Sequence, residues 1–308
     1  MSEQNPNPVV VAVGQDELDA ALEYAAGEAT RLGCGLHLIQ FVQVVSDGPE
    51  TVLVDVTDAE RVGRRSMHAA IQRLRCLIGD ATLTSELVLG GVMPALVASA
   101  RDARMVVLQR RAPSRGRLVV TRSVISGLAA CTPVPVVSIP ASWSVGRHTN
   151  PRPTVTVGVA SVENAEEVLR TAVGAARSRD ATLLVLHARD FRGAGHDIIE
   201  RTRLDGHQAP RATAEIHATL NRLGDLVTGV PVRIDAPRLD PADALILASR
   251  VSDLVVIGRH DPLAPLGSHL GPVARTVLAD AACPVLLADP RKRDGRFASF
   301  EGRADQTA

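Results

Sequence analysis

Residues 255–278 read VVIGRHDPLAPLGSHLGPVARTVL, and this stretch decides the fold because it runs from a buried apolar strand into a helix. The connection between the two contains three glycines, Gly258, Gly267 and Gly271. A glycine-rich turn from a strand into a helix is where many α/β proteins bind a phosphate. The stretch therefore predicts an α/β fold with a candidate anion site.

The strand of this stretch has a counterpart in the first half of the chain. Val107 in MVVLQ and Val256 in LVVIG are 149 positions apart. The same spacing separates Pro135 in PVPVVSIP from Pro284 in ACPVLLADP. Repeats that keep their spacing over such a distance indicate two copies of one unit.

Each unit alternates continuous apolar strands, such as VVVAVG and VTVGVA, with alanine-rich amphipathic helices. This alternation is typical of a parallel sheet that is covered by helices on both faces. We therefore predict two doubly wound, Rossmann-like sheets of five parallel strands. Ligands of such sheets bind outside the carboxyl ends of the strands, where the strand order reverses.

The boundary between the units is expected in the polar, proline-containing segment SWSVGRHTNPRPT. The predicted division is a first domain at 1–141, a linker at 142–153, a second domain at 154–290 and a flexible tail at 291–308.

A long loop is predicted after the second strand of each unit, at 43–57 and at 189–208. Loops of this length are either lids over a site or flexible insertions, and the sequence leaves both readings open.

The composition excludes several classes of protein. The chain has 34 basic and 34 acidic side chains, so its net charge indicates neither a nucleic-acid nor a membrane partner. Aromatic residues are only 2% of the chain, which argues against base-stacking platforms. The N-terminus does not resemble a signal peptide, and the four widely spaced cysteines are expected to be buried, reduced thiols. These features predict a cytoplasmic protein.

The repeated strand order and the Cys-Pro-Val start of the last strand resemble the universal stress protein family in its tandem, two-domain form. The resemblance covers the chain up to about residue 290. It implies a fold of the adenine nucleotide alpha hydrolase type. It also implies that the two units pair through their last strands as an intramolecular pseudo-dimer, because an apolar edge strand needs a cover.

Nucleotide-binding members of that family hold phosphates in a Gly-x2-Gly-x9-Gly-Ser/Thr segment, with an acidic residue at the end of the first strand. In the second unit the resemblance places Gly258 and Gly271 at the first and third glycine, but Asp261 at the second. Pro272 lies where the pattern has Ser or Thr, and Ala160 lies where it has the acidic residue. Asp261 would repel phosphates, and Ala160 offers no acceptor to a sugar hydroxyl.

In the first unit the three glycine positions hold Gln109, Ala112 and Arg122. Ser123 keeps the hydroxyl, and Gly14 stands for the acid. Because several contacts worth about 1 kcal/mol or more each are missing, tight ATP binding is not expected in either unit.

Two candidate anion sites follow. One is the glycine loop of the second unit, which could equally be a plain turn from strand to helix. The other is the arginine-rich segment of the first unit, which could equally be a solvated basic loop. The candidate ligand-binding residues are Gly258, Arg259, Gly267, Ser268, Gly271, Arg110 and Ser123.

No catalytic motif accompanies these candidates, since the chain has neither a G-x-S-x-G elbow nor a Walker A sequence, and its histidines form no ligand set. We therefore predict a non-enzymatic stress-response or regulatory protein with degenerate nucleotide sites and no metal. The alternative is a sensor that binds ATP or another nucleotide through the Gly258–Gly271 loop. A flavoprotein-like or adenylate-forming enzyme is a third reading. The sequence leaves open whether the chain also forms a homodimer.

Overall fold

The computed structural model describes residues 7–14, 19–42, 56–79, 81–110, 118–132, 134–146, 151–161, 165–188, 198–259 and 270–289. The chain divides into two compact units, Met1–Val145 and Gly146–Ala308, and the division falls inside the segment predicted as the linker. The predicted tail and most of the predicted loop at 43–57 lie outside the described residues.

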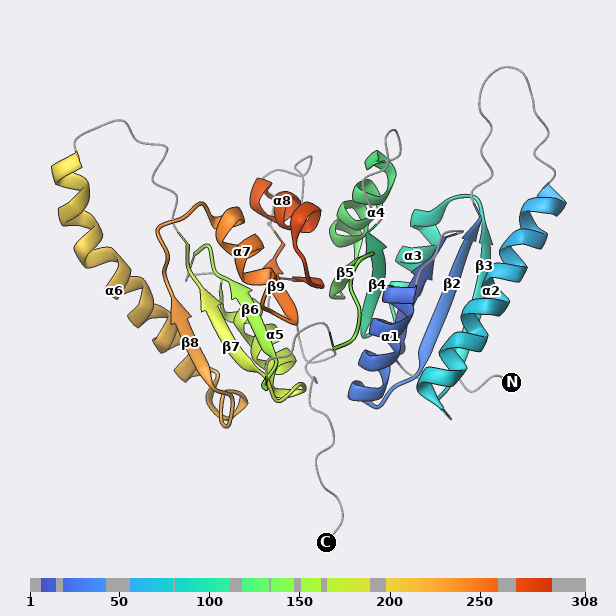
Figure 1. Cartoon of the computed structure of the whole chain (residues 1–308), viewed down its shortest axis with the longest axis horizontal. Coiled ribbons are helices and arrows are strands. Elements are labelled where there is room, and N and C mark those ends of the chain that lie inside the picture. Colours follow the sequence, from blue (N-terminus) through green and yellow to red (C-terminus); the bar gives the residue numbers. More distant parts are fainter. Residues whose placement is uncertain are drawn as a thin grey trace, which may run out of the picture. The chain divides into compact units, whose positions relative to one another are not determined.

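The first unit alternates strands and helices along its whole length (Figure 1). Its elements are β1 (Val9–Val13), α1 (Asp19–Leu32), β2 (Leu36–Val42), α2 (Val56–Ile78), β3 (Leu83–Leu89), α3 (Val92–Ala100), β4 (Met105–Arg110), α4 (Leu118–Cys131) and β5 (Val136–Pro140).

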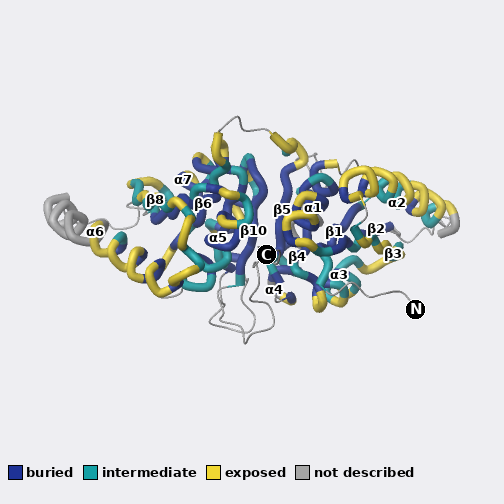
Figure 2. The backbone as a smooth tube through the Cα atoms, turned by 90° about the horizontal axis from the view of Figure 1, so that it is seen from below, coloured by how far each residue is buried: buried dark blue, intermediate teal, exposed yellow. Residues whose placement is uncertain are grey.

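The strands of the first unit form a parallel sheet in the order β3-β2-β1-β4-β5. Parallel neighbours need a crossover connection, and the helices between the strands supply it. Helix α1 packs against α2 and α3 packs against α4, so that one pair covers each face of the sheet (Figure 2). The strand order reverses between β1 and β4.

The second unit repeats this arrangement. Its elements are β6 (Thr154–Gly158), α5 (Glu166–Arg177), β7 (Thr182–Leu186), α6 (Ile198–Arg222), a short 3₁₀ turn (Gly224–Leu226), β8 (Val232–Asp235), α7 (Pro241–Ser249), β9 (Leu254–Gly258), α8 (Pro272–Asp280) and β10 (Val285–Ala288). The strands are parallel in the order β8-β7-β6-β9-β10. The strand order reverses between β6 and β9. The prediction of two doubly wound parallel sheets is therefore confirmed, whereas pairing of their last strands remains a prediction.

The core is aliphatic, as the low aromatic content requires. Every residue of β1, β5 and β10 is buried, while much of the outer surface of α2 and of the described part of α6 is exposed (Figure 2). Helices α1 and α5 place alanines against the sheet, which lets helix and sheet backbones approach closely. Burial of about 25 cal/mol per Å² of apolar surface is the main source of stability for such layers.

Two details differ from the sequence prediction. Helix α6 begins at Ile198, inside the predicted loop 189–208, and continues through Pro210. Proline breaks a helix by removing one N–H donor and crowding the preceding turn, but here the helix continues beyond it. The cysteines also differ, since only Cys283 is buried, while Cys76 and Cys131 are exposed thiols.

Gly63 marks a close approach between α2 and the sheet. A Cβ atom at this position would lie 2.3 Å from Cγ2 of Val42 and 3.0 Å from Cδ1 of Leu87. Val42 is fully buried, so its side chain has little room to move away.

We therefore expect Gly63→Ala to destabilise the protein by about 1–3 kcal/mol, because the added methyl overpacks the layer between α2 and the sheet. Urea denaturation measures the change. Gly27→Ala in α1 is the matched control, since a Cβ there meets nothing within 4 Å. The control should be about 0.5–1 kcal/mol more stable than the wild type. Equal stability of Gly63→Ala and wild type would contradict this packing.

Candidate functional site

The carboxyl ends of the strands meet at one edge of each sheet, and the strand order reverses between β1 and β4 and between β6 and β9. Ligands of open α/β sheets bind at such a reversal. The residues that follow these strand ends are therefore the candidate site of each unit.

In the first unit the side chain of Gln109 occupies the reversal point. Gln109 lies near the carboxyl end of β4 and is 9% exposed. Its Oε1 accepts a hydrogen bond of 3.1 Å from the backbone N–H of Ala21, in the first turn of α1. The first N–H groups of a helix have no partner inside the helix and are the groups that bind anions. Gln109 therefore occupies, from within the chain, the backbone N–H donor of Ala21 that a bound phosphate would use.

A second glutamine, Gln40, fastens the end of β1. Its side chain is fully buried, and Nε2 donates to the carbonyl oxygen of Gly14 at 2.7 Å. Gly14 is the position where the family resemblance expects an acidic residue. The sequence analysis missed Gln40, although a polar residue inside the apolar strand LHLIQFV was the available signal.

His187 has a similar role in the second unit. It follows β7, is buried, and its Nδ1 bonds the carbonyl oxygen of Val159 at 2.8 Å. Because a carbonyl oxygen only accepts, Nδ1 carries the proton. The backbone N–H of His187 donates to the carbonyl oxygen of Asp235, the last residue of β8, and β8 is the other neighbour of β7 in the sheet. The ends of three strands are thus joined through one residue.

Gly258 is the last residue of β9, and packing explains why this position holds a glycine. A Cβ atom there would lie 2.9 Å from Cγ2 of Val168 in α5. The glycine therefore lets α5 approach the strand, and no ligand is needed to account for it.

Arg259 follows directly and is a buried cation. Its side chain is 4% exposed, and its guanidinium lies 3.5 Å from a carboxylate oxygen of Asp289, itself 9% exposed. The backbone N–H of Arg259 also donates to Ala288 at 2.9 Å. Arg259 and Asp289 follow the neighbouring strands β9 and β10, so the ion pair joins the two strand ends.

Gly271 precedes α8, and Pro272 is the first residue of that helix. The backbone of Gly271 is extended, with φ of −63° and ψ of 168°, rather than left-handed. A Cβ atom there would meet nothing within 4 Å. The other two members of the predicted loop, Gly267 and Ser268, lie outside the described residues, so the predicted anion nest stays a prediction.

The first-unit candidates lie on two different elements. Arg110 is the half-buried last residue of β4 and pairs in register with Pro140 of β5. Ser123 belongs to α4, beyond its first turn, and its side chain is outside the described part of the chain.

Neither a metal site nor a membrane span is found in the parts of the chain that the structure describes. In these parts no three side chains of His, Cys, Asp or Glu gather where an ion could bind. No helix among the same residues is both long and apolar enough to cross a bilayer.

Comparison with known sequences assigns both units to one family. The model of the "Universal stress protein family" matches residues 6–140 and 152–289. Universal stress protein Rv1996 of Mycobacterium tuberculosis is 26% identical over 313 aligned residues, covering 94% of this chain and 97% of that protein. Universal stress protein Rv2623 of the same organism is 30% identical over 213 residues, covering 68% of this chain and 69% of that protein.

Solved structures support the same fold. A universal stress protein from Archaeoglobus fulgidus DSM 4304 superposes with a TM-score of 0.61 at 14% identity, covering 92% of this chain and 98% of that one. The functionally unknown protein PA1789 from Pseudomonas aeruginosa PAO1 gives 0.59 at 16% identity, with 92% and 93% covered.

Substitution of the two described glycines of the second-unit loop should change stability by different amounts. We expect Gly258→Ala to cost about 1–3 kcal/mol of unfolding free energy, because its methyl would overlap Val168. Gly271→Ala should change stability by less than about 0.5 kcal/mol, since its backbone is extended and its surroundings are open. Chemical denaturation of both variants measures this. A neutral Gly258→Ala, or a costly Gly271→Ala, would mean that packing does not explain these glycines.

Proposed function

Because the chain belongs to the universal stress protein family, we propose that it is a stress-response protein that acts without catalysis and whose two nucleotide sites are degenerate. In this proposal the protein has a regulatory role, and neither unit holds ATP tightly.

The hydrogen bond between Gln109 and Ala21 is the observation that carries the proposal. A phosphate at this edge would need the N–H groups of a helix N-terminus and a glycine that lets the backbone approach. In the first unit the glycine is replaced by Gln109, and its carboxamide accepts from the α1 N–H at 3.1 Å. A ligand would have to displace a side chain that is 9% exposed, and the buried Gln109 carboxamide would lose its hydrogen bond to Ala21.

The second unit supports the proposal through different residues. Its first glycine, Gly258, is explained by the 2.9 Å approach of Val168, and its third, Gly271, is followed by a proline without an N–H. Ala160, where an acid would bind a sugar hydroxyl, is exposed and has no such group. Each loss removes one contact that a nucleotide would use.

A second candidate function is a nucleotide sensor that uses the Gly258–Gly271 loop, and Arg259 is the observation that favours it. Arg259 supplies a positive charge at the carboxyl edge, directly after the first glycine. Arginine binds phosphates through paired N–H donors, so ATP is the ligand to test. Against this candidate, Asp289 lies 3.5 Å from the same guanidinium and would compete with the phosphate.

The remaining predictions from the sequence belong to this proposal. We propose that the protein acts in the cytoplasm, with neither nucleic acid nor a membrane as partner. We also propose that the two units pair through β5 and β10 as a pseudo-dimer, because an apolar edge strand needs a cover.

Titration with ATP, followed by melting temperature, tests the proposed function. We expect no shift at millimolar ATP in the wild type. A ligand at 100 times its dissociation constant would add about 2.7 kcal/mol, which is easily detected. Refolding from urea, monitored in parallel, should likewise be insensitive to ATP.

Gly271→Val and Ser123→Ala distinguish the two units if a shift occurs. A shift that Gly271→Val removes and Ser123→Ala retains would replace the proposed function by the sensor of the second unit. The fold should tolerate Gly271→Val because a Cβ there meets nothing within 4 Å.

A further inference from the structure

β3 is the outermost strand of the first unit, and in the described part of the chain no strand pairs with its outer edge (Figure 1). It pairs with β2 over its full length of seven residues. Whereas β2 is almost wholly buried, more than half of β3 is exposed, namely Thr84, Ser85, Glu86 and Leu89. A long, uncovered edge strand is a template on which another chain can pair.

The backbone of β3 presents a row of hydrogen-bonding groups at this edge. In a parallel pair, alternate residues direct their N–H and C=O groups to the neighbouring strand. The N–H of Leu36 in β2 donates to the carbonyl oxygen of Thr82 at 2.9 Å, so the even-numbered residues of β3 face β2. The groups of the odd-numbered residues therefore point outward. They have no hydrogen-bond partner among the residues that the structure describes, and they belong to Leu83, Ser85, Leu87 and Leu89.

The corresponding edge strand of the second unit is built differently. β8 has only four residues, and two of them, Arg233 and Asp235, are exposed charges. Short edge strands and exposed charges are devices that prevent pairing with other chains. β3 is longer, and Glu86 is its single charged residue. Of the two edges, that of β3 is therefore the one suited to receive a further strand.

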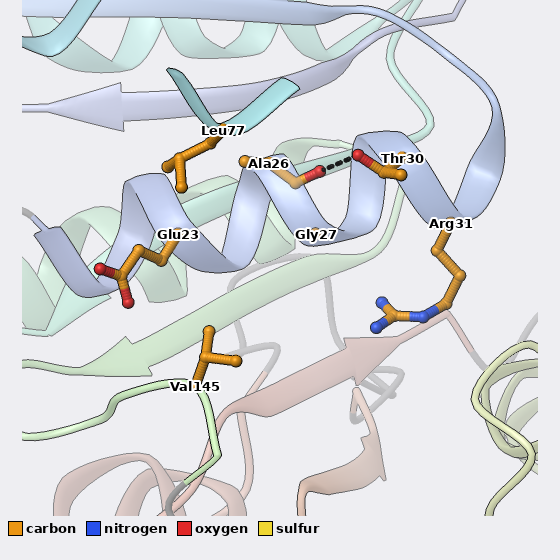
Figure 3. A pocket seen from close by; sticks show the side chains of 7 residues that line it. All are labelled: Glu23, Ala26, Gly27, Thr30, Arg31, Leu77 and Val145. Carbon is orange, nitrogen blue, oxygen red and sulfur yellow. Dashed lines mark hydrogen bonds between the residues drawn. The ribbon is translucent and has the colours of Figure 1, made fainter. Parts of the chain in front are cut away.

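Helix α2 covers one face of β3, and its contacts show which side of the helix faces inward. Gly63 faces the sheet, because a Cβ atom there would touch side chains of β2 and β3. Arg73 faces α1, since it forms ion pairs of 3.0 and 2.7 Å with two acidic residues of that helix. Figure 3 shows Leu77, four residues further on, beside Ala26 of α1.

The side of α2 that faces away from α1 carries arginines. A helix turns by about 100° per residue, so Arg64 and Arg75 lie about 180–200° around the axis from Arg73. They are thus directed toward the open edge of β3. Arg64 is paired with Glu60 at 2.5 Å, whereas Arg75 is exposed and forms no ion pair in the described part of the chain. An acidic side chain on a strand beside β3 would meet Arg75.

We propose that the edge of β3 binds an extended, acidic segment of another protein by strand addition. The outward N–H and C=O groups of β3 pair with the segment, and pairing of this kind supplies affinity without regard to sequence. Arg75 then selects acidic side chains on the α2 face. This inference is independent of whether either unit binds a nucleotide.

The opposite face of β3 and the arginines of α2 narrow the choice of partner further. Side chains alternate along a strand, and Leu87 lies on the α2 face, so Glu86 lies on the other face. The bound segment therefore has acidic residues at alternate positions, with uncharged residues between them. A second copy of this chain does not fit, because edge-to-edge pairing would bring the arginines of two α2 helices together.

Fluorescence anisotropy with the full-length protein at low salt tests the proposal. The probe is the fluorescein-labelled peptide TEVETEV, whose glutamates all lie on one face of an extended strand. We expect saturable binding. The peptide TVEEETV has the same composition and charge, but it should bind at least about tenfold more weakly, because its glutamates cannot all face α2. Absence of saturable binding, or equal binding of the two peptides, overturns the proposal.

Variants of the protein test the contacts one by one. Ser85→Pro removes one outward N–H but no bond to β2, so the strand should persist while TEVETEV binds at least about tenfold more weakly. Ser85→Ala keeps the N–H and is the matched control. Arg75→Gln should weaken binding by about threefold, whereas Arg250→Gln, at an exposed position of the second unit, should not. Circular dichroism reports whether each variant folds. Unchanged binding by a folded Ser85→Pro variant contradicts strand addition.

A change in the peptide makes the test independent of how the protein tolerates proline. Two forms of TEVETEV carry N-methyl groups on either the odd or the even residues, and each form lacks the N–H groups of one edge. Because only one edge of the peptide pairs with β3, at least one form should bind about tenfold more weakly. If both forms bind as well as TEVETEV itself, the proposal is wrong.

Discussion

Parallel pairing of every strand within a unit is the constraint from which the rest of the structure follows. It requires a helix after each strand, and it brings all carboxyl ends of the strands to one edge. The carbonyls at these ends and the N–H groups of the next helices must then find partners. In a nucleotide-binding protein a ligand supplies some of them. Here Gln40, Gln109 and His187 supply them from within the chain.

The two units meet this requirement with different residues, although their folds repeat. The position of Gln109 in the first unit is that of Gly258 in the second, where the space is taken by Val168 of α5. Gln40 and His187 come from equivalent strands and fasten the neighbouring strand end in both units. In both units the strand ends are thus fastened by contacts from inside the chain.

Local patterns in the sequence predicted the fold well because strands and helices follow from short-range periodicity. The apolar run LVVIG, which is a strand by its sequence, forms β9 at Leu254–Gly258. Asp240 caps α7 by accepting hydrogen bonds from the backbone N–H groups of Ala242 and Asp243. The predicted loop at 189–208 was too long, because α6 already begins at Ile198. The site was harder to predict. Gln109 and Ala21 are 88 positions apart, and nothing in either local sequence indicates that they meet.

The contact between Tyr24 and Trp143 has a practical consequence for following the folding of this protein. These residues are the only tyrosine and the only tryptophan of the chain, and both belong to the first unit. Their centroids are 5.5 Å apart, which is within range of efficient energy transfer from tyrosine to tryptophan. Indole fluorescence therefore reports on the first unit alone, whereas backbone circular dichroism reports on both. Comparing the two signals separates the unfolding of one half of a repeated protein from that of the other without any added label.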